Sequence, residues 1–212
     1  MANSSPVKAL LGCLVLALGA AVVAQDDNNR SEPLVFESES ATIAGETNLF
    51  VARRPRITKG NLRIEGDEAT ATSVDFTERS EWRFTGNVRI AVDTAVLEAG
   101  SAVFTFEDER LSYGELTGTP VTFSDFDKVR QTPIQGRAEH ISYDAVARKL
   151  RLTGEAWVQR DRTQMLSCDL FYDFAAAERD TGLVVTSASD DCAFRVLVER
   201  DRDDQPSNND PQ

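Results

Sequence analysis

Apolar and polar residues alternate along most of this chain. From Phe84 to Ile90, apolar residues and one glycine occupy every second position, and residues 150–158 repeat the arrangement. Positions two apart lie on the same face of a β-strand, so the alternation predicts strands with one apolar and one polar face. Turn-forming residues interrupt the pattern at 107–110, 127–133 and 159–163. The pattern extends from residue 57 to residue 199 and predicts an all-β fold.

The predicted strands belong to a repeat. Each copy is a strand that crosses a small residue, followed by a second strand that reaches a glycine. The glycines recur at nearly constant spacing: Gly66, Gly100 and Gly136 in the first strands, and Gly86, Gly118 and Gly154 in the second. A fourth, incomplete copy starts at Cys168–Asp173. A period of 32 to 36 residues predicts stacked copies of one β unit, none of which can bury its apolar face alone.

Two of these glycines lie in the middle of predicted strands, where glycine normally weakens the structure. Gly86 and Gly154 occupy the apolar face at the same level of the repeat. Their recurrence predicts a bulge that bends the sheet at that level. In Gly118–Pro120, the proline cannot donate a ladder hydrogen bond, which favours a bulge or an edge there as well.

Residues 1–24 have the features of an export signal. Lys8 supplies a positive charge, residues 9–24 are apolar, and small residues precede Gln25. This run is shorter than the roughly 20 residues that a membrane-spanning helix needs, so we expect cleavage after Ala24. The alternative is a leader retained as a single membrane anchor. The remaining divisions are predicted as follows: 25–56 a flexible or edge segment, 57–200 the β domain, and 201–212 a disordered acidic tail.

Charge and side-chain inventory exclude several functions. The formal net charge is −12, whereas a nucleic-acid-binding protein needs a basic face. The sequence has no serine elbow, no HExxH motif and no glycine-rich phosphate loop before a helix. His140 is the only histidine, and the cysteines lack metal-ligand spacing. We therefore expect neither an enzyme nor a nucleic-acid-binding protein, and no cofactor or metal.

Removal of the leader would leave two cysteines, Cys168 and Cys192. In an exported protein such a pair predicts a disulfide. Two separate thiols are the alternative.

Two consecutive segments carry a specific motif. Pro133–Tyr143 (PIQGRAEHISY) and Leu152–Gln159 (LTGEAWVQ) closely resemble the central repeat of the OstA-like family of lipopolysaccharide-transport proteins, which includes LptA, LptC and the N-terminal domain of LptD. Shorter segments resemble neighbouring parts of the same family: Ile64–Asp67, Phe84–Val88 and Thr119–Phe123. The resemblance spans residues 57–190. The residues between the leader and the first clear repeat, and the cysteine pair, are not part of it.

The resemblance implies an elongated, open β-jellyroll, a V-shaped periplasmic trough with an apolar groove. It implies a bridge protein that shields the acyl chains of lipid A and relays lipopolysaccharide from the inner to the outer membrane. The implied partners are lipopolysaccharide, an inner-membrane LptC-like domain, an outer-membrane LptD-like domain, and further copies of the chain stacked end to end as a homo-oligomer. A retained leader would instead indicate an LptC-like anchored receptor.

The resemblance assigns lipid contact to Leu62, Ile64, Phe123 and Tyr143. The alternation adds further apolar positions on the same surface: Phe84, Val88, Ile141, Leu150 and Leu152. A closed core between two sheets would show the same alternation, so the pattern leaves both interpretations open. A secreted β-solenoid that binds polysaccharide is an alternative from another class of function. It would use Trp82 and Trp157 on a solvent-exposed face.

Overall fold

The computed structural model describes residues 32–44, 49–128, 130–174 and 192–199, which form one antiparallel sheet of 13 strands. The N-terminal strands are short: β1 (Val35–Glu37), β2 (Ser40–Ala44), β3 (Leu49–Arg53), β4 (Arg56–Lys59), β5 (Leu62–Glu65) and β6 (Glu68–Ala71). Long strands and one short final strand follow: β7 (Ser80–Val92), β8 (Ala95–Glu107), β9 (Arg110–Asp127), β10 (Thr132–Asp144), β11 (Lys149–Arg160), β12 (Thr163–Asp173) and β13 (Arg195–Val198). The all-β prediction is confirmed. The predicted leader and acidic tail lie outside the described residues.

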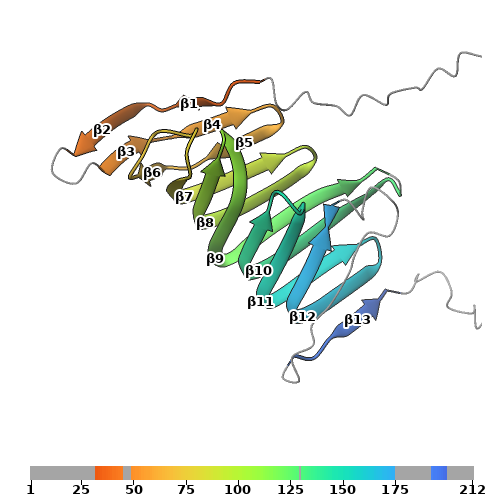
Figure 1. Ribbon diagram of the computed structural model, residues 1–212. Coiled ribbons are helices and arrows are strands. Elements are labelled where there is room, and N and C mark those ends of the chain that lie inside the picture. Colours follow the sequence, from red (N-terminus) through yellow and green to blue (C-terminus); the bar gives the residue numbers. More distant parts are fainter. Residues whose placement is uncertain (1–31, 45–48, 129, 175–191, 200–212) are drawn as a thin grey trace, which may run out of the picture.

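Strands β7 to β12 pair in chain order, so their part of the sheet is a meander (Figure 1). At its N-terminal end the sheet divides, because β7 has two neighbours on one side. Residues 82–85 of β7 pair with β6, and residues 89–92 pair with β5. From β6 the sheet continues to β3 and β2, and from β5 it continues to β4 and β1. Strands from the predicted edge segment therefore extend the same sheet.

Pairing of the long strands is interrupted near their middles. The β7–β8 register shifts between Thr85 and Val88, and the β11–β12 register shifts between Thr153 and Ala156. Gly86 and Gly154 lie at these interruptions with φ angles of +71° and +74°, a conformation that glycine adopts without the steric penalty of a side chain. The bulges confirm the bend that the glycine spacing predicts.

The bend in β9 falls at the proline that the sequence singles out. Thr117 and Val121 pair with β10, whereas the residues between them, including Pro120, do not. The proline therefore occupies a bulge in a central strand, as predicted, where its missing N–H leaves no gap in the ladder.

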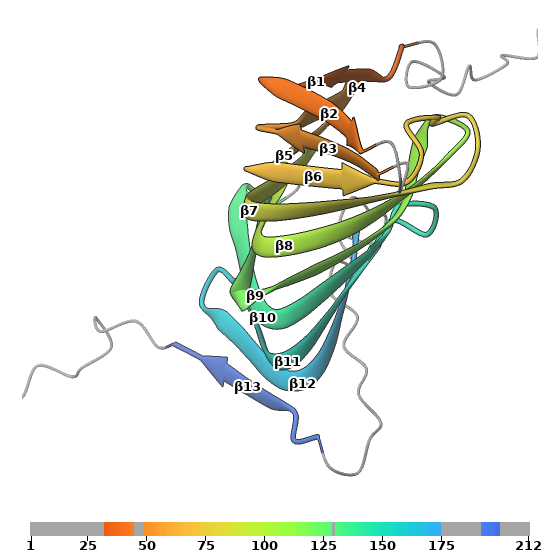
Figure 2. The ribbon, with the colours of Figure 1, turned by 90° about the vertical axis from the view of Figure 1, so that its left-hand side faces the viewer.

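The bends divide the sheet into two walls that face each other across an apolar interior (Figure 2). Wall A comprises β1, β4, β5, β13 and the strand segments 88–92, 95–99, 121–127, 132–138, 156–160 and 163–167. Wall B comprises β2, β3, β6 and the segments 80–85, 101–107, 110–117, 140–144, 149–153 and 169–173. We call the space between the walls the trough, the bend its floor, and the opposite side, where the turns of the two walls lie, its mouth.

Candidate functional site

All nine residues predicted to contact lipid belong to the apolar cluster inside the trough. Leu62 is partly buried at the edge of this cluster. The other eight are at most 6% exposed: Ile64, Phe84, Val88, Phe123, Ile141, Tyr143, Leu150 and Leu152. The structure thus brings residues from both walls into one apolar interior, which their own side chains fill.

Two adjoining cavities open at the mouth of the trough. Their volumes are about 470 and 360 Å³. They share four lining residues: Val92, Asp93, Tyr143 and Arg148. Among the nine predicted residues, Leu62 lines the larger cavity and Tyr143 lines both. These two side chains therefore mark the point at which the interior meets solvent.

Tyr172 and Lys59 make polar contacts between the walls across the mouth. The hydroxyl of Tyr172 on wall B donates a hydrogen bond of 2.8 Å to Asp125 Oδ2 on wall A. Nearer the N-terminal end, Lys59 Nζ on wall A lies 3.4 Å from Glu109 Oε2 in the β8–β9 turn. The side chain of Glu109 is 46% exposed, whereas Tyr172 is 1% exposed. Lys59 is buried, but solvent around Glu109 weakens the ion pair, and its 3.4 Å distance is longer than the 2.8 Å of the Tyr172 bond, so the Tyr172 bond is the stronger of the two.

Burial raises the pKa of both tyrosines at the mouth. For Tyr172 the largest cause is loss of hydration, and the negative charge of Asp125 raises the pKa further. Loss of hydration also raises the pKa of Tyr143. Both phenols therefore remain protonated at physiological pH, and Tyr172 keeps the proton that it donates to Asp125.

Aromatic rings from both walls meet at each end of the trough. The N-terminal aromatic cluster consists of Phe36, Phe50, Phe76, Trp82 and Phe106. The C-terminal aromatic cluster consists of Phe123, Tyr143, Tyr172 and Phe174. In the first cluster, Phe36 on wall A and Phe50 on wall B have ring centroids 5.5 Å apart. In the second, Phe123 on wall A lies 5.0 Å from Tyr172 on wall B. Both clusters thus span the trough.

The two tryptophans lie on opposite faces of the sheet. Trp82 is fully buried in the trough. Trp157 is half-buried on the outer face of wall A, where the guanidinium carbon of Arg137 lies 5.2 Å from its ring centroid. A polysaccharide-binding face would need exposed rings arranged together. The positions of these two rings do not support that alternative.

A larger cavity, of about 850 Å³, lies where the bends of β9 to β12 meet the segment Cys192–Arg195. Its lining combines charges of both signs, from Arg137, Glu139, Glu155 and Arg195. None of the nine predicted residues lines this cavity. It is therefore separate from the apolar trough.

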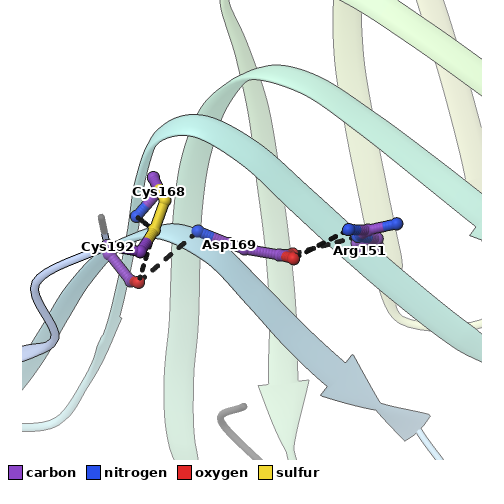
Figure 3. A network of polar contacts seen from close by, with 5 residues as sticks. Arg151, Cys168, Asp169 and Cys192 are labelled. Atoms are coloured by element: carbon purple, nitrogen blue, oxygen red, sulfur yellow. Dashed lines mark hydrogen bonds and ion pairs between the residues drawn. A yellow bond between two sulfur atoms is a disulfide. The ribbon is translucent and has the colours of Figure 1, made fainter. Parts of the chain in front are cut away.

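A disulfide joins Cys168 of β12 to Cys192, the pair that the sequence singles out (Figure 3). Their Cα atoms are 5.6 Å apart, and the backbone N–H of Cys168 donates to Cys192 Sγ. The next residue, Asp169, accepts two hydrogen bonds from the guanidinium of Arg151, at 2.8 and 3.0 Å. Because Cys192 lies three residues before β13, the disulfide holds this strand beside β12.

Sequence reasoning missed the contacts across the mouth and the N-terminal aromatic cluster. Tyr172 and Asp125 are 47 residues apart, and Lys59 and Glu109 are 50 apart, so local alternation does not connect them. The one available signal was the repeat. Tyr172 pairs with Leu150, which pairs in turn with Tyr143, so the two tyrosines occupy one level of the sheet.

Within the described ranges, no group of three or more His, Cys, Asp or Glu side chains could hold a metal ion. The same residues contain no helix that is long and apolar enough to span a membrane.

Residues 64–177, more than half of the 212-residue chain, match the family model described as LptA/(LptD N-terminal domain) LPS transport protein. No curated protein sequence matches the chain. A solved structure of LptH, the LptA homologous periplasmic component of the lipopolysaccharide transport device from Pseudomonas aeruginosa, is similar with a TM-score of 0.48 and 12% identity. This similarity covers 81% of the present chain and 99% of LptH. At these values it adds no weight to the family match.

Proposed function

The chain belongs to the family of LptA and LptD N-terminal-domain lipopolysaccharide-transport proteins, and from this premise we propose that it is a periplasmic bridge between the two membranes. It holds the acyl chains of lipid A in its trough and relays lipopolysaccharide toward the outer membrane. The sugars and phosphates stay in solvent outside the mouth.

The observation that carries the proposal is an apolar trough within the family-matched region. Of the nine predicted residues, all except Leu62 lie inside residues 64–177. Each acyl methylene removed from water contributes about 0.8 kcal/mol. A trough lined with aliphatic and aromatic side chains therefore favours acyl chains over sugars. Charged side chains of both signs line the mouth and keep it hydrated beside the polar headgroup: Lys59, Asp93, Glu107, Asp108, Arg110, Asp125, Asp127, Lys128 and Arg148.

Entry of acyl chains requires the walls to move apart, because interior side chains fill the trough. The contacts of Lys59 and Tyr172 across the mouth oppose this movement. The Lys59–Glu109 pair, in which Lys59 is buried and Glu109 is 46% exposed, is partly screened by solvent and contributes about 1 kcal/mol. The Tyr172–Asp125 bond contributes about 1.5–3 kcal/mol, the range for hydrogen bonds to charged groups. Strands β7 to β12 each run from one wall to the other through the floor, so the backbone keeps the walls joined while the mouth opens.

Photo-crosslinking in cells that make lipopolysaccharide tests the proposal. A photoreactive residue replaces Tyr143, which points into the trough, or Tyr113, an exposed tyrosine on the outer face of the neighbouring strand. We expect a light-dependent lipopolysaccharide adduct at position 143 and none at position 113. An exported, folded protein without an adduct at 143 would mean that the interior is a closed core, and the transport proposal would then be abandoned.

End-to-end assembly with further copies, or with LptC-like and LptD-like domains, belongs to the same proposal. Strand β13 exposes Val196, Leu197 and Val198 by 49–67%, and no described strand pairs with its outer edge, where another chain could add a strand. We expect the substitution Val196→Pro to reduce self-association measured by analytical ultracentrifugation. Unchanged association would place the contact elsewhere.

The LptC-like anchored receptor differs from the bridge protein in its N-terminus. Intact-mass measurement of the protein isolated from cells separates the two. Cleavage after Ala24 supports the soluble bridge, and a retained apolar run over 9–24 supports the anchored receptor.

A further inference from the structure

Two hydrogen-bond donors are buried at the N-terminal end of the trough without acceptors among the described residues. Trp82 Nε1 and Ser80 Oγ have no hydrogen-bond partner among the described residues. Trp82 is fully buried and Ser80 is 3% exposed. The indole N–H can only donate, so it can be satisfied only by an acceptor oxygen or nitrogen from elsewhere. The great majority of buried donors in protein structures have a hydrogen-bond acceptor. The lack of an acceptor at Trp82 and Ser80 therefore needs an explanation.

The two donors face the same space. Ser80 and Trp82 are two positions apart on β7, so both side chains point into the trough, with Cα atoms about 7 Å apart. They pair with Phe106 and Phe104 of β8, which are also fully buried. Two long, paired strands thus hold the donors in place. Near the opposite end of the trough, the buried hydroxyl of Tyr172 has its acceptor in Asp125, whereas Thr132 Oγ1 has no partner among the described residues.

Rings on short elements cover the Trp82 side chain, at centroid distances of 4.9–5.5 Å. Phe36 lies in three-residue β1, Phe50 in five-residue β3, and Phe76 in the loop between β6 and β7. These three rings are partly buried, and Phe76 stacks on the Trp82 indole at 4.9 Å with an interplanar angle of 8°. Short strands and a loop can shift at small energetic expense compared with the long ladders of β7 and β8.

The chemistry of the cluster selects its occupant. The walls of the site are aromatic rings, so the occupant is mainly apolar. The donors require one or two uncharged acceptor oxygens next to the apolar part. An acyl chain with its ester or amide carbonyl, or with a 3-hydroxyl group, has this combination. A free carboxylate would bring a charge into an apolar site, which is strongly unfavourable without a partner.

We propose that Ser80 and Trp82 form an acyl-carbonyl subsite, in which Trp82 Nε1–H and Ser80 Oγ–H donate to oxygens at the head-proximal end of a lipid acyl chain. The inference rests on the proposed function and adds a polar anchor inside the apolar trough. Phe36, Phe50 and Phe76 cover the subsite in the lipid-free protein and move aside when the chain enters. This hydrogen bond fixes how deeply the acyl chain inserts, because the carbonyl oxygen has to stay within hydrogen-bonding distance of Trp82 Nε1.

Conservative variants of the full-length mature protein test the subsite. Trp82→Phe keeps a ring and removes the N–H, and Ser80→Ala removes only the hydroxyl. We expect each variant to bind purified lipopolysaccharide about tenfold more weakly, the effect of one lost hydrogen bond of about 1.4 kcal/mol. Ser80→Ala should keep or increase stability to urea, because it removes a buried donor that lacks an acceptor. The matched control is Trp157→Phe, on the outer face, which should leave affinity unchanged.

A spectroscopic measurement reports on the same donor directly. The protein has two tryptophans, so its NMR spectrum contains two indole N–H signals, and Trp157→Phe assigns them. Addition of lipopolysaccharide should shift the Trp82 indole proton downfield and leave the Trp157 signal in place. Vesicles of phosphatidylethanolamine and phosphatidylglycerol form a second arm. A shift with both lipids means that the subsite recognises acyl carbonyls in general, and a shift with lipopolysaccharide alone assigns it to lipid A.

Failure of the subsite and failure of the proposed function have different signatures. The subsite alone is overturned by the following result: the wild-type protein binds lipopolysaccharide without a shift of its Trp82 indole signal, and folded Ser80→Ala and Trp82→Phe bind with unchanged affinity. Absence of lipopolysaccharide binding by the wild-type protein overturns the proposed function and the subsite with it. If Trp82→Phe does not fold, Ser80→Ala and the wild-type indole signal decide the question.

Discussion

Replacement of Tyr172 by Phe removes the stronger contact across the mouth and keeps the ring in the C-terminal aromatic cluster. The lost hydrogen bond has a charged acceptor and a donor that is 1% exposed. The carboxylate of Asp125 still accepts hydrogen bonds from Thr94 Oγ1 and from the backbone N–H of Phe126 after the substitution. We therefore expect a loss of stability near the lower end of the range for such bonds, about 1.5 kcal/mol.

The same substitution should strengthen lipopolysaccharide binding. The bond exists only while the walls are closed, so its loss raises the population of the open trough by the corresponding factor. Apparent affinity scales with the fraction of protein that is competent to bind. A change of about 1.4 kcal/mol corresponds to a factor of ten. Tyr172→Phe should thus be less stable and bind about tenfold more tightly.

Urea unfolding and equilibrium lipopolysaccharide binding measure the two effects independently. Tyr113→Phe is the matched control, because its hydroxyl donates to Glu115 at 3.2 Å on the exposed outer face. We expect the control to change stability by less than about 0.5 kcal/mol and to leave affinity unaltered. Equal or weaker binding by a destabilised Tyr172→Phe variant would refute the idea that acyl chains enter by separation of the walls.

Three further predictions concern the bend, the disulfide and the tyrosines. Gly154→Ala should lower the free energy of unfolding by at least about 1–2 kcal/mol, because φ is +74° and the new Cβ would lie 2.9 Å from Glu139 Cβ. The control is Gly100→Ala, whose Cβ would lie 3.6 Å from its nearest neighbour. In the same urea titration this control should lose clearly less free energy of unfolding. The double substitution Cys168→Ser and Cys192→Ser should lower the free energy of unfolding by up to about 3 kcal/mol. Hydrogen exchange should show the largest loss of protection in β13. Equal protection with and without the disulfide would mean that pairing with β12 alone holds that strand. The raised pKa values of Tyr143 and Tyr172 stabilise the folded state fully below the unfolded value of about 10, and this contribution decreases as pH rises above that value. The variant with Phe at both positions should therefore lose less stability between pH 9 and pH 11 than the wild-type protein, and parallel losses would show that these phenols are not protected from deprotonation.

The amino-acid sequence alone was sufficient for features that depend on neighbours along the chain. Alternation from Phe84 to Ile90 identifies a strand because side-chain direction follows from backbone geometry. Gly86 and Gly154 identify the bend because glycine adopts the positive φ angles found there without the steric penalty of a side chain. The repeat and the motif at Pro133–Tyr143 indicate the family for the same reason, since each unit carries its own pattern.

Features that join distant segments were decided only by the tertiary structure. Alternation cannot distinguish a filled interior from an open one, because both place the same residues on one face. The structure shows an interior filled by its own side chains, with two adjoining cavities at the mouth. Contacts such as Tyr172 with Asp125 depend on the curvature that several successive bulges accumulate, and no single bulge determines it. The two donors on β7 look ordinary in the sequence. They become unusual only after strands and a loop from elsewhere in the chain bury them without providing an acceptor.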